Sequence, residues 1–267
     1  MSFVATRIRG KLGRVNSRLD QALMARGLCE SREKAKRAVM AGQVRVNGQV
    51  ARKASEMVRE TDTLALDAQE KFVSRGGHKL EHALEHFRVA VRDLTAVDLG
   101  ASTGGFTDCL LQRGATRVFA VDVGQGQLAW KLRNDPRVIV LEKTNARELT
   151  GEKLSAAGGQ QSAVTVPLVV VDCSFISLRK ILPAAVKLLA PGGRIVALVK
   201  PQFEAGKAEA DKGEGVITDP AVHARVLAEL EAFVQAELPG LAWRGVTESP
   251  LLGPAGNKEF LVLLERI

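Results

Sequence analysis

The 267-residue sequence has no tyrosine, only three cysteines and few aromatic residues of any kind. Phe3 is the only aromatic residue before position 72. Without rings, this first part of the chain cannot bind single-stranded bases by stacking, and a nucleic-acid contact there must use phosphates and shape. The cysteines, at positions 29, 109 and 173, form no C-x-x-C pair. Their scatter argues against a disulfide framework or structural zinc site and favours a reducing, cytoplasmic location.

Long apolar runs are also missing from the sequence. No stretch approaches the roughly 18 apolar residues that a membrane-spanning helix needs, so we expect no membrane partner. Residues 1–10 contain Arg7 and Arg9 with no apolar segment after them, unlike a secretory signal. Histidines at positions 78, 82 and 86 share one helix face, but no second cluster of metal ligands accompanies them. We therefore expect no metal ion.

Positive charge is concentrated in one part of the chain. Residues 1–60 contain 14 Lys and Arg against 5 Asp and Glu, a net charge of +9, whereas residues 61–267 contain 24 against 25, a net charge of −1. The whole +8 of the chain therefore lies in its first quarter. Such an asymmetry indicates a module that binds a polyanion, attached to a nearly neutral body.

The basic segment has the pattern of a small folded domain. Ser17 and Ser31 can each cap a short helix that has apolar residues on one face. Val44–Val46 and Gln49–Val50 flank an Asn-Gly turn, and Thr63–Leu66 has the pattern of a last strand. These elements predict a compact α+β unit.

Residues 16–67 resemble the S4 RNA-binding domain, on the pattern R-L-D-Q-A-L…G-L-x-x-S-R-x-x-A-K-x-A-V…G-x-V-x-V-N-G. The resemblance implies a helical face that docks on structured RNA. It divides the chain into an S4-like domain with a basic N-terminal arm at 1–67, a linker at 68–74 and a second domain at 75–267. The expected RNA-binding residues are Arg14, Arg18, Arg32, Lys34, Lys36, Arg37 and Arg45.

The second domain alternates between strand and helix patterns. Continuously apolar strands are typical of a parallel sheet that is buried on both faces. We therefore predict a doubly wound, Rossmann-like α/β fold whose sheet is mostly parallel with an antiparallel last strand. The expected strands are 96–99, 117–123, 138–141, 168–172, 194–199 and 260–264, and the expected helices are 77–87, 106–113, 177–189 and 220–237.

The first strand of this domain leads into a Gly-rich turn at 97–106. Its spacing, D-x-G-x-x-x-G-G, departs from the dinucleotide fingerprint and resembles motif I of S-adenosylmethionine-dependent methyltransferases. The acid before the first glycine would repel a pyrophosphate but suits the cationic sulfonium and ammonium of S-adenosylmethionine. The residues expected to bind this cofactor are Asp98, Gly100, Ser102, Thr103, Gly104, Gly105, Phe106, Asp122, Asn145 and Asp172. Among them, Asp122 suits the ribose hydroxyls.

Four charged residues from distant parts of the chain indicate a second group of site residues, at the edge of the predicted sheet where the Gly-rich turn lies. Asp172 and Lys200 end two strands, Glu259 begins the last strand, and Lys79 lies early in the helix before the first strand. Ligands of open α/β sheets bind at the carboxyl ends of the strands. We therefore expect these four side chains to converge on one site.

The segments around the four residues resemble the FtsJ/RrmJ-like RNA 2′-O-methyltransferases. They are S-R-G-G-H-K-L at 74–80, V-D-C-S-F at 171–175, L-V-K-P-Q-F-E at 198–204 and G-N-K-E-F at 256–260. With an S4 domain in front, the chain resembles the TlyA (hemolysin A) group of ribosomal RNA methyltransferases. The resemblance implies S-adenosylmethionine as methyl donor, a ribosomal RNA or subunit as partner, and methylation of a cytidine 2′-oxygen. It also implies the catalytic tetrad Lys79, Asp172, Lys200 and Glu259.

Lys200 is the expected activator of the ribose hydroxyl, either as a neutral amine base or as a cation that stabilises the developing alkoxide. The sequence leaves both roles open. Amino-group methylation is disfavoured because the 172–175 segment lacks the prolines of an [ND]-P-P-[FY] site. Pyrimidine C5 methylation is disfavoured because Cys173, its only candidate nucleophile, lacks a Pro-Cys context.

Two alternatives without catalysis also stay open. One is an RNA-binding ribosome-assembly factor with an inactive methyltransferase body. The other is a membrane-lytic hemolysin, which the lack of a spanning or aromatic-rich amphipathic segment disfavours. The chain stops at Ile267 without an extra C-terminal helix, which favours 23S over 16S rRNA as the target. The sequence gives no oligomeric state, and it leaves open whether the polar loop at 207–215 is a lid.

Overall fold

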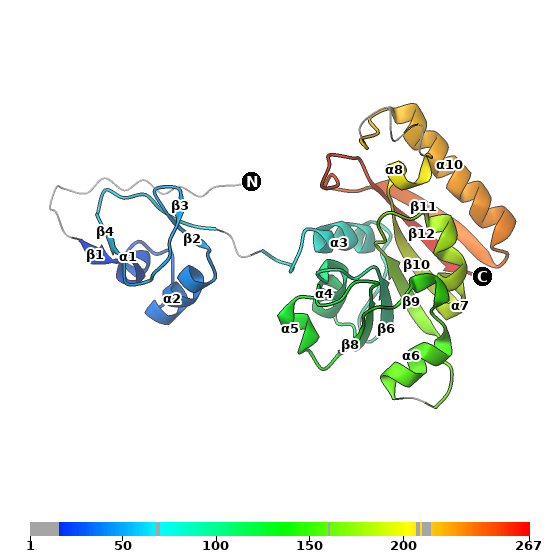
Figure 1. Cartoon of the computed structure of the whole chain (residues 1–267), viewed down its shortest axis with the longest axis horizontal. Helices are drawn as coiled ribbons and strands as arrows, with labels where there is room; N and C mark the ends of the chain where they lie inside the picture. The colour runs from blue at the N-terminus through cyan, green and yellow to red at the C-terminus, as the bar shows by residue number, and fades with distance from the viewer. Residues whose placement is uncertain (1–15, 68–69, 160, 207–208, 210–214) are drawn as a thin grey trace. The chain divides into compact units, whose positions relative to one another are not determined.

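The computed structural model describes residues 16–67, 70–159, 161–206, 209 and 215–267. Arg14 and most of the loop at 207–215 lie outside these described residues. The chain divides into two compact units, Met1–Glu70 and Lys71–Ile267 (Figure 1). The small unit has one apolar core, and the large unit has one on each face of its sheet.

The small unit packs two helices against short antiparallel strands, as predicted. Leu19, Leu23, Ala35 and Val39 of the helices form its core with residues of the strands, Val44 among them. Its elements are β1 (Ser17–Arg18), α1 (Leu19–Ala25), α2 (Arg32–Met40), β2 (Val44–Val46), β3 (Gln49–Val50), β4 (Met57–Val58) and β5 (Leu64–Leu66). The strands form a β1–β4 pair and a β3-β2-β5 sheet.

One of the two predicted helix caps is present. The Ser31 hydroxyl accepts a 3.2 Å hydrogen bond from the backbone N–H of Lys34 at the start of α2. The predicted cap at Ser17 was wrong, because Ser17 pairs with Val58 in the β1–β4 ladder. Helix α1 therefore starts after Arg18, which provides no side-chain cap.

Seven strands form the sheet of the large unit in the order β11-β12-β10-β9-β6-β7-β8. The pairs from β10 to β8 are parallel, and β12 is antiparallel to both β10 and β11. This confirms the predicted sheet and its antiparallel last strand. The bounds are β6 (Thr95–Leu99), β7 (Arg117–Val121), β8 (Val138–Leu141), β9 (Val166–Val171), β10 (Leu189–Val199), β11 (Leu241–Glu248) and β12 (Phe260–Arg266).

Helices cover both faces of this sheet (Figure 1). The strands alternate between the two cores, so that Val169 and Val171 of β9 face one core and Leu168 and Val170 face the other. On one face lie α3 (Gly76–His86), α4 (Gly105–Gln112) and α5 (Trp130–Arg133); on the other lie α6 (Gly151–Gly158), α7 (Leu182–Leu188) and α10 (Pro220–Glu237). Shorter turns are η1 (Ala146–Glu148), η2 (Leu178–Lys180) and α8 (Pro201–Glu204).

Other features also differ from the sequence-based prediction. Strand β11 was missed because it is an edge strand with exposed residues along its length, so it lacks a continuous apolar run. The predicted helix at 177–189 is the turn η2 followed by α7, where a proline occupies the first turn. Phe72, within the predicted linker at 68–74, is 2% exposed in the core of the large unit.

Candidate active site

The predicted site residues of the large unit meet at the carboxyl edge of its parallel strands. This edge includes the switch point where β6 has β7 on one side and β9 on the other. Asp172 follows β9 and Lys200 follows β10. Val199 pairs with Phe260 in the antiparallel β10–β12 ladder, which places Lys200 and Glu259 at the same edge.

The expected tetrad lines one pocket as two ion pairs. Lys79 of α3 pairs with Glu259, and both side chains are less than a tenth exposed. Lys200 Nζ lies 2.7 Å from Asp172 Oδ1 and donates a 2.7 Å hydrogen bond to Ser174 Oγ. The contact with Asp172 is an ion pair without the directional geometry of a hydrogen bond. Since Ser174 takes one of its three donors, Lys200 can still donate to a ligand in the pocket.

The Gly-rich turn approaches two other backbone segments so closely that side chains would not fit. Gly100 has a φ of +86°, and a Cβ there would lie 2.6 Å from the carbonyl oxygen of Asp172. A Cβ at Gly105 would lie 2.3 Å from Ser74 Oγ and 2.9 Å from the backbone nitrogen of Gly77. Only glycine is compatible with both positions. The turn therefore forms a cradle between the loop after β9 and the start of α3.

Asp98 is a fully buried carboxyl in β6. Thr107 Oγ1 donates a 2.7 Å hydrogen bond to its Oδ2, and its Oδ1 has no hydrogen-bond partner among the described residues. Burial raises the pKa of Asp98 to about 7 against the Thr107 hydrogen bond, and the Asp172 and Asp122 carboxylates raise it further. An orphaned carboxyl oxygen at this depth fits a site for a cationic ligand.

A second pocket adjoins the first and shares Gly100, Ser102, Asp172 and Ser174 with it. Its volume of about 480 Å³ is in the range of small-molecule sites. Asp122 lies in its wall, where Oδ2 accepts from the Ser102 backbone N–H at 2.8 Å and Oδ1 from the Gly124 N–H at 2.7 Å. Each carboxylate oxygen can accept another hydrogen bond, so Asp122 suits two neighbouring hydroxyl groups.

The other expected cofactor residues divide between these pockets and the protein interior. Thr103 and Phe106 line the first pocket, and Asn145 lines the second. Asn145 Oδ1 caps η1 by accepting from the Arg147 N–H at 3.1 Å. Of the expected cofactor residues, Asp98 and Gly104 are absent from both linings.

Ser174 and Phe175, in the loop after β9, have surroundings that the sequence did not predict. Ser174 proves to be the hydrogen-bond partner of Lys200. Phe175 is 90% exposed at a left-handed φ of +62°, with its ring centroid 5.2 Å from that of Phe203. A large exposed ring on strained backbone beside a pocket indicates a functional surface, and only the tertiary structure reveals it.

The site disfavours one competing chemistry, pyrimidine C5 methylation. Burial raises the pKa of the Cys173 thiol to about 12, which keeps it a thiol and disfavours it as a nucleophile for C5 methylation. No group of metal-binding side chains occurs among the described residues. His82 of the histidine face instead contacts the Thr247 hydroxyl, at 3.1 Å from Nε2.

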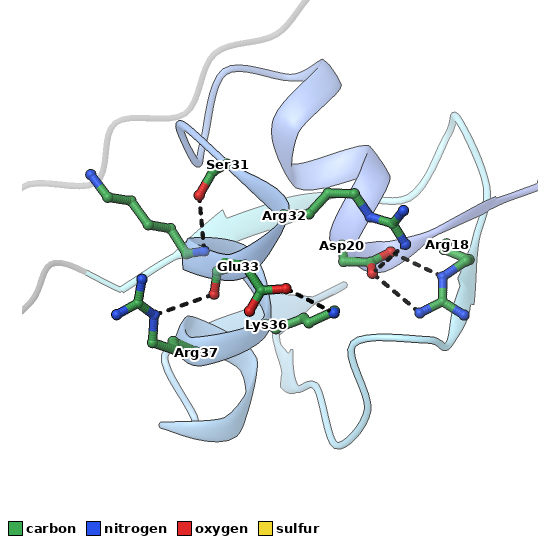
Figure 2. A network of polar contacts seen from close by, with 8 residues as sticks. Arg18, Asp20, Ser31, Arg32, Glu33, Lys36 and Arg37 are labelled. Carbon is green, nitrogen blue, oxygen red and sulfur yellow. Dashed lines mark hydrogen bonds and ion pairs between the residues drawn. The ribbon is translucent and has the colours of Figure 1, made fainter.

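The expected RNA-binding side chains that the structure describes lie at the surface of the small unit or half-buried there. Most of these basic side chains form an ion pair with an acidic side chain. Lys34 pairs with Glu30, and Lys36 with Glu33. Arg45 Nε lies 3.0 Å from Asp67 Oδ2. Arg18 and Arg32 both pair with one carboxylate, that of Asp20 (Figure 2).

Comparison with known proteins agrees with both units. Residues 72–266 match the FtsJ-like methyltransferase family, and residues 17–64 match the S4 domain. A 16S/23S rRNA (cytidine-2′-O)-methyltransferase, TlyA of Mycobacterium tuberculosis, is 49% identical over 252 residues, 93% of this chain and 89% of that protein. Hemolysin A of Brachyspira hyodysenteriae is 40% identical over 245 residues, 91% of this chain and 98% of that protein.

A solved structure gives the same result. A hemolysin-like protein of Streptococcus thermophilus aligns with a TM-score of 0.69 and 44% identity, over 94% of this chain and 88% of that chain. In the part of this chain that the structure describes, no helix is both long and apolar enough to span a membrane. The chain belongs to the FtsJ-like methyltransferase family, and within it to the TlyA (hemolysin A) group that carries an S4 domain in front.

Proposed function

We propose that this chain transfers a methyl group from S-adenosylmethionine to the 2′-oxygen of a cytidine in ribosomal RNA. The observation that carries the proposal is the pocket in which Lys79–Glu259 and Lys200–Asp172 lie beside the Gly-rich turn. The 49% identical Mycobacterium relative, named for cytidine 2′-O-methylation, supports the substrate. Such a substrate locates the reaction where ribosomes are, in the cytoplasm.

The residues of the two pockets fit the methyl donor. The glycine cradle admits a ligand close to the backbone, and Asp122 can accept both ribose hydroxyls. Asp98 lines neither pocket, but its buried carboxyl with one unpartnered oxygen suits the positive charges of the methionine part. When bound, S-adenosylmethionine supplies an electrophilic methyl group on a cationic sulfur.

In the proposed reaction, Lys200 acts on the ribose hydroxyl. Its Nζ donates to the 2′-oxygen and stabilises the negative charge that develops there as the hydroxyl proton passes to water. The oxygen then bonds to the methyl carbon while the carbon–sulfur bond of the methyl donor breaks, and the electron pair of that bond stays on the sulfur. We propose the cationic role because Lys200 Nζ forms an ion pair with the Asp172 carboxylate at 2.7 Å. Lys79 and Glu259 form the second ion pair in the lining of this pocket.

The small unit supplies most of the affinity for RNA in this proposal. Residues 1–60 carry the net charge of +9, and phosphate contacts by such a module give strong, salt-dependent binding. The exposed Phe175 ring at the second pocket offers a stacking surface for a base near the reacting ribose.

We propose 23S rRNA as the first substrate to test. 16S rRNA is tested as well, because the Mycobacterium relative is named for both RNAs. The purified chain is incubated with radiolabelled S-adenosylmethionine and separate 50S and 30S subunits, and the product nucleosides are identified by mass spectrometry. We expect 2′-O-methylcytidine. A product of 5-methylcytidine would contradict the proposed chemistry, and label only in the 30S arm would contradict the 23S preference.

The Lys200→Ala variant separates catalysis from binding. We expect at least a hundredfold loss of methyl transfer, since a donor aimed at developing charge contributes on that order, with unchanged affinity for the subunit. Lys258→Ala, which removes an exposed lysine paired with Glu248, is the matched control and should keep full activity. Equal methylation by Lys200→Ala and the parent chain would refute the mechanism.

Subunit binding and dye release from liposomes distinguish the two alternatives, a ribosome-assembly factor and a lytic protein, from the proposed enzyme. A ribosome-assembly factor with an inactive body would bind subunits without any methyl transfer by the parent chain. A lytic protein would release dye from liposomes, which we expect the purified chain to leave intact.

A further inference from the structure

The small unit holds a buried carboxylate that neither its core nor the proposed reaction explains. Asp20, in the first turn of α1, is 0% exposed. Arg18 donates to both of its oxygens, from Nε to Oδ1 at 3.1 Å and from Nη2 to Oδ2 at 3.2 Å. Arg32 of α2 donates from Nη2 to Oδ2 at 3.0 Å. Figure 2 shows the two guanidinium groups converging on this one carboxylate.

Asp20 is an anion at neutral pH. The hydrogen bond from Arg18 is the main cause that holds the pKa of Asp20 at about 2, and Arg32 lowers it further, against the effect of burial. A buried carboxylate is tolerated only while it is paired. Neither arginine can therefore turn away from Asp20 without leaving that charge less well satisfied.

The other acids beside basic residues in this unit are of a different kind. The side chains of Glu30 and Glu33, paired with Lys34 and Lys36, are 83% and 72% exposed. Water can replace such surface partners at little cost, so these pairs leave their lysines free to move. Among the acids in these described ion pairs, only Asp20 has a buried carboxylate.

The two arginines still present donors to the outside. A guanidinium has five N–H groups, of which Arg18 uses two and Arg32 one on Asp20. Their side chains are 39% and 48% exposed. The three charges together leave a net charge of +1 at this surface, carried by two planar donors of fixed direction.

We propose that Asp20 is a positioning residue that holds Arg18 and Arg32 as a preformed fork for the phosphate oxygens of folded RNA. Planar guanidinium groups bind phosphate oxygens with two donors at once, which requires a defined orientation. Fixing them before binding removes the entropy cost of ordering two long side chains in the complex. This inference rests on the proposed RNA substrate and adds a residue to its recognition.

The direction in which Asp20→Asn changes RNA affinity tests the fork. Asp20→Asn makes the small unit more positive by one charge, so attraction between charges alone would tighten RNA binding. The fork requires the opposite: we expect about tenfold weaker binding, because two arginines must then be ordered in the complex. Affinity is measured by filter binding of the full chain to 50S subunits, to 23S rRNA and to a non-ribosomal RNA duplex, over a range of salt concentrations.

Glu33→Gln is the matched control, because it removes one acid beside a basic residue of the same surface but an exposed one. It should bind RNA as tightly as the parent chain or more tightly. Arg18→Lys and Arg32→Lys keep the charge but lose the planar fork, and each should weaken binding. In an Arg18→Ala/Arg32→Ala background, Asp20→Asn should weaken binding no further.

Several results would overturn the fork. One is equal or tighter RNA binding by Asp20→Asn; another is a lowered melting temperature with normal affinity at a temperature where the variant is folded, which would show a structural role only. Failure of the parent chain to methylate ribosomal RNA would refute the proposed function alone. In that case the duplex arm still reports on the fork, through the same comparison of Asp20→Asn with Glu33→Gln.

Discussion

Asp98 shows how much the surroundings of a single side chain change its chemistry. The same residue type at Asp122 lies at a pocket wall with both oxygens hydrogen-bonded to backbone N–H groups. Asp98 has one hydrogen-bonded oxygen and complete burial, and its pKa is raised to about 7. Burial penalises the ionised form, and one hydrogen bond does not compensate. Sequence spacing identifies both acids but does not reveal that Asp98 is completely buried.

This raised pKa predicts a pH dependence of stability. The carboxyl ionises at its ordinary pKa of 3.8 in the unfolded chain but only near 7 in the folded one. Between these values the unfolded chain binds fewer protons, so the free energy of unfolding falls as pH rises from about 4 to about 7 and levels off above. Asp98→Asn should lack this decrease. Urea unfolding followed by circular dichroism, at half-unit steps of pH, measures the difference.

Asp93→Asn removes an exposed carboxyl of the same unit and serves as the control. Its stability profile should follow that of the parent chain. Parallel profiles for the parent chain and Asp98→Asn would show that Asp98 does not keep its proton in the folded state.

At the scale of elements, the site depends on how two loops are joined. Glu204 in α8 accepts from Ser177 Oγ at 2.6 Å and from the Leu178 backbone N–H at 2.7 Å. It therefore links the loop after β10, which carries Lys200, to the loop after β9, which carries Asp172. Burial raises the pKa of Glu204, and its two hydrogen bonds oppose that effect. The Lys200–Asp172 ion pair thus depends on the hydrogen bonds of Glu204, although neither Lys200 nor Asp172 takes part in them.

We expect Glu204→Ala to lower kcat by about tenfold or more while KM for RNA changes little, because small displacements of reacting groups are costly. Glu204→Gln keeps an acceptor for the Leu178 N–H and should recover part of the loss. Glu237→Ala, at an exposed position of α10, is the control. Steady-state methylation of ribosomal subunits gives both constants. Full activity of Glu204→Ala would mean that the strands alone hold the loops in place.

For the whole molecule, charge and catalysis are separated between two units with separate cores. The net charge of +9 belongs to residues 1–60, and the expected methyl-donor pockets belong entirely to the large unit. Phe72 packs in the large unit, so a cut after Glu70 leaves its core intact.

Removal of residues 1–70 should therefore leave S-adenosylmethionine affinity unchanged and abolish stable binding of ribosomal RNA. The residual binding should have a shallower dependence on salt, because fewer phosphates are neutralised. Isothermal calorimetry and filter binding at several salt concentrations measure the two properties. Equal RNA affinity of the truncated and full chains would show that the large unit carries the RNA site.

The sequence determined much about this protein without the structure. Apolar strands alternating with helices gave the parallel sheet, because strands buried on both faces must be apolar throughout. The carboxyl-edge rule placed Asp172, Lys200 and Glu259 in one region, since strand ends of a doubly wound sheet meet at one edge. The asymmetric charge and the S4-like pattern located the small unit.

The tertiary structure decided what spacing cannot express. It divided the tetrad into two ion pairs, gave Lys200 the partner Ser174, and revealed Phe175 as an exposed ring. It also showed that Asp20, an ordinary acid in the sequence, is buried between two arginines. Pairing and burial arise when residues far apart in the chain pack together, and one-dimensional patterns carry only the periodicity that makes such packing possible.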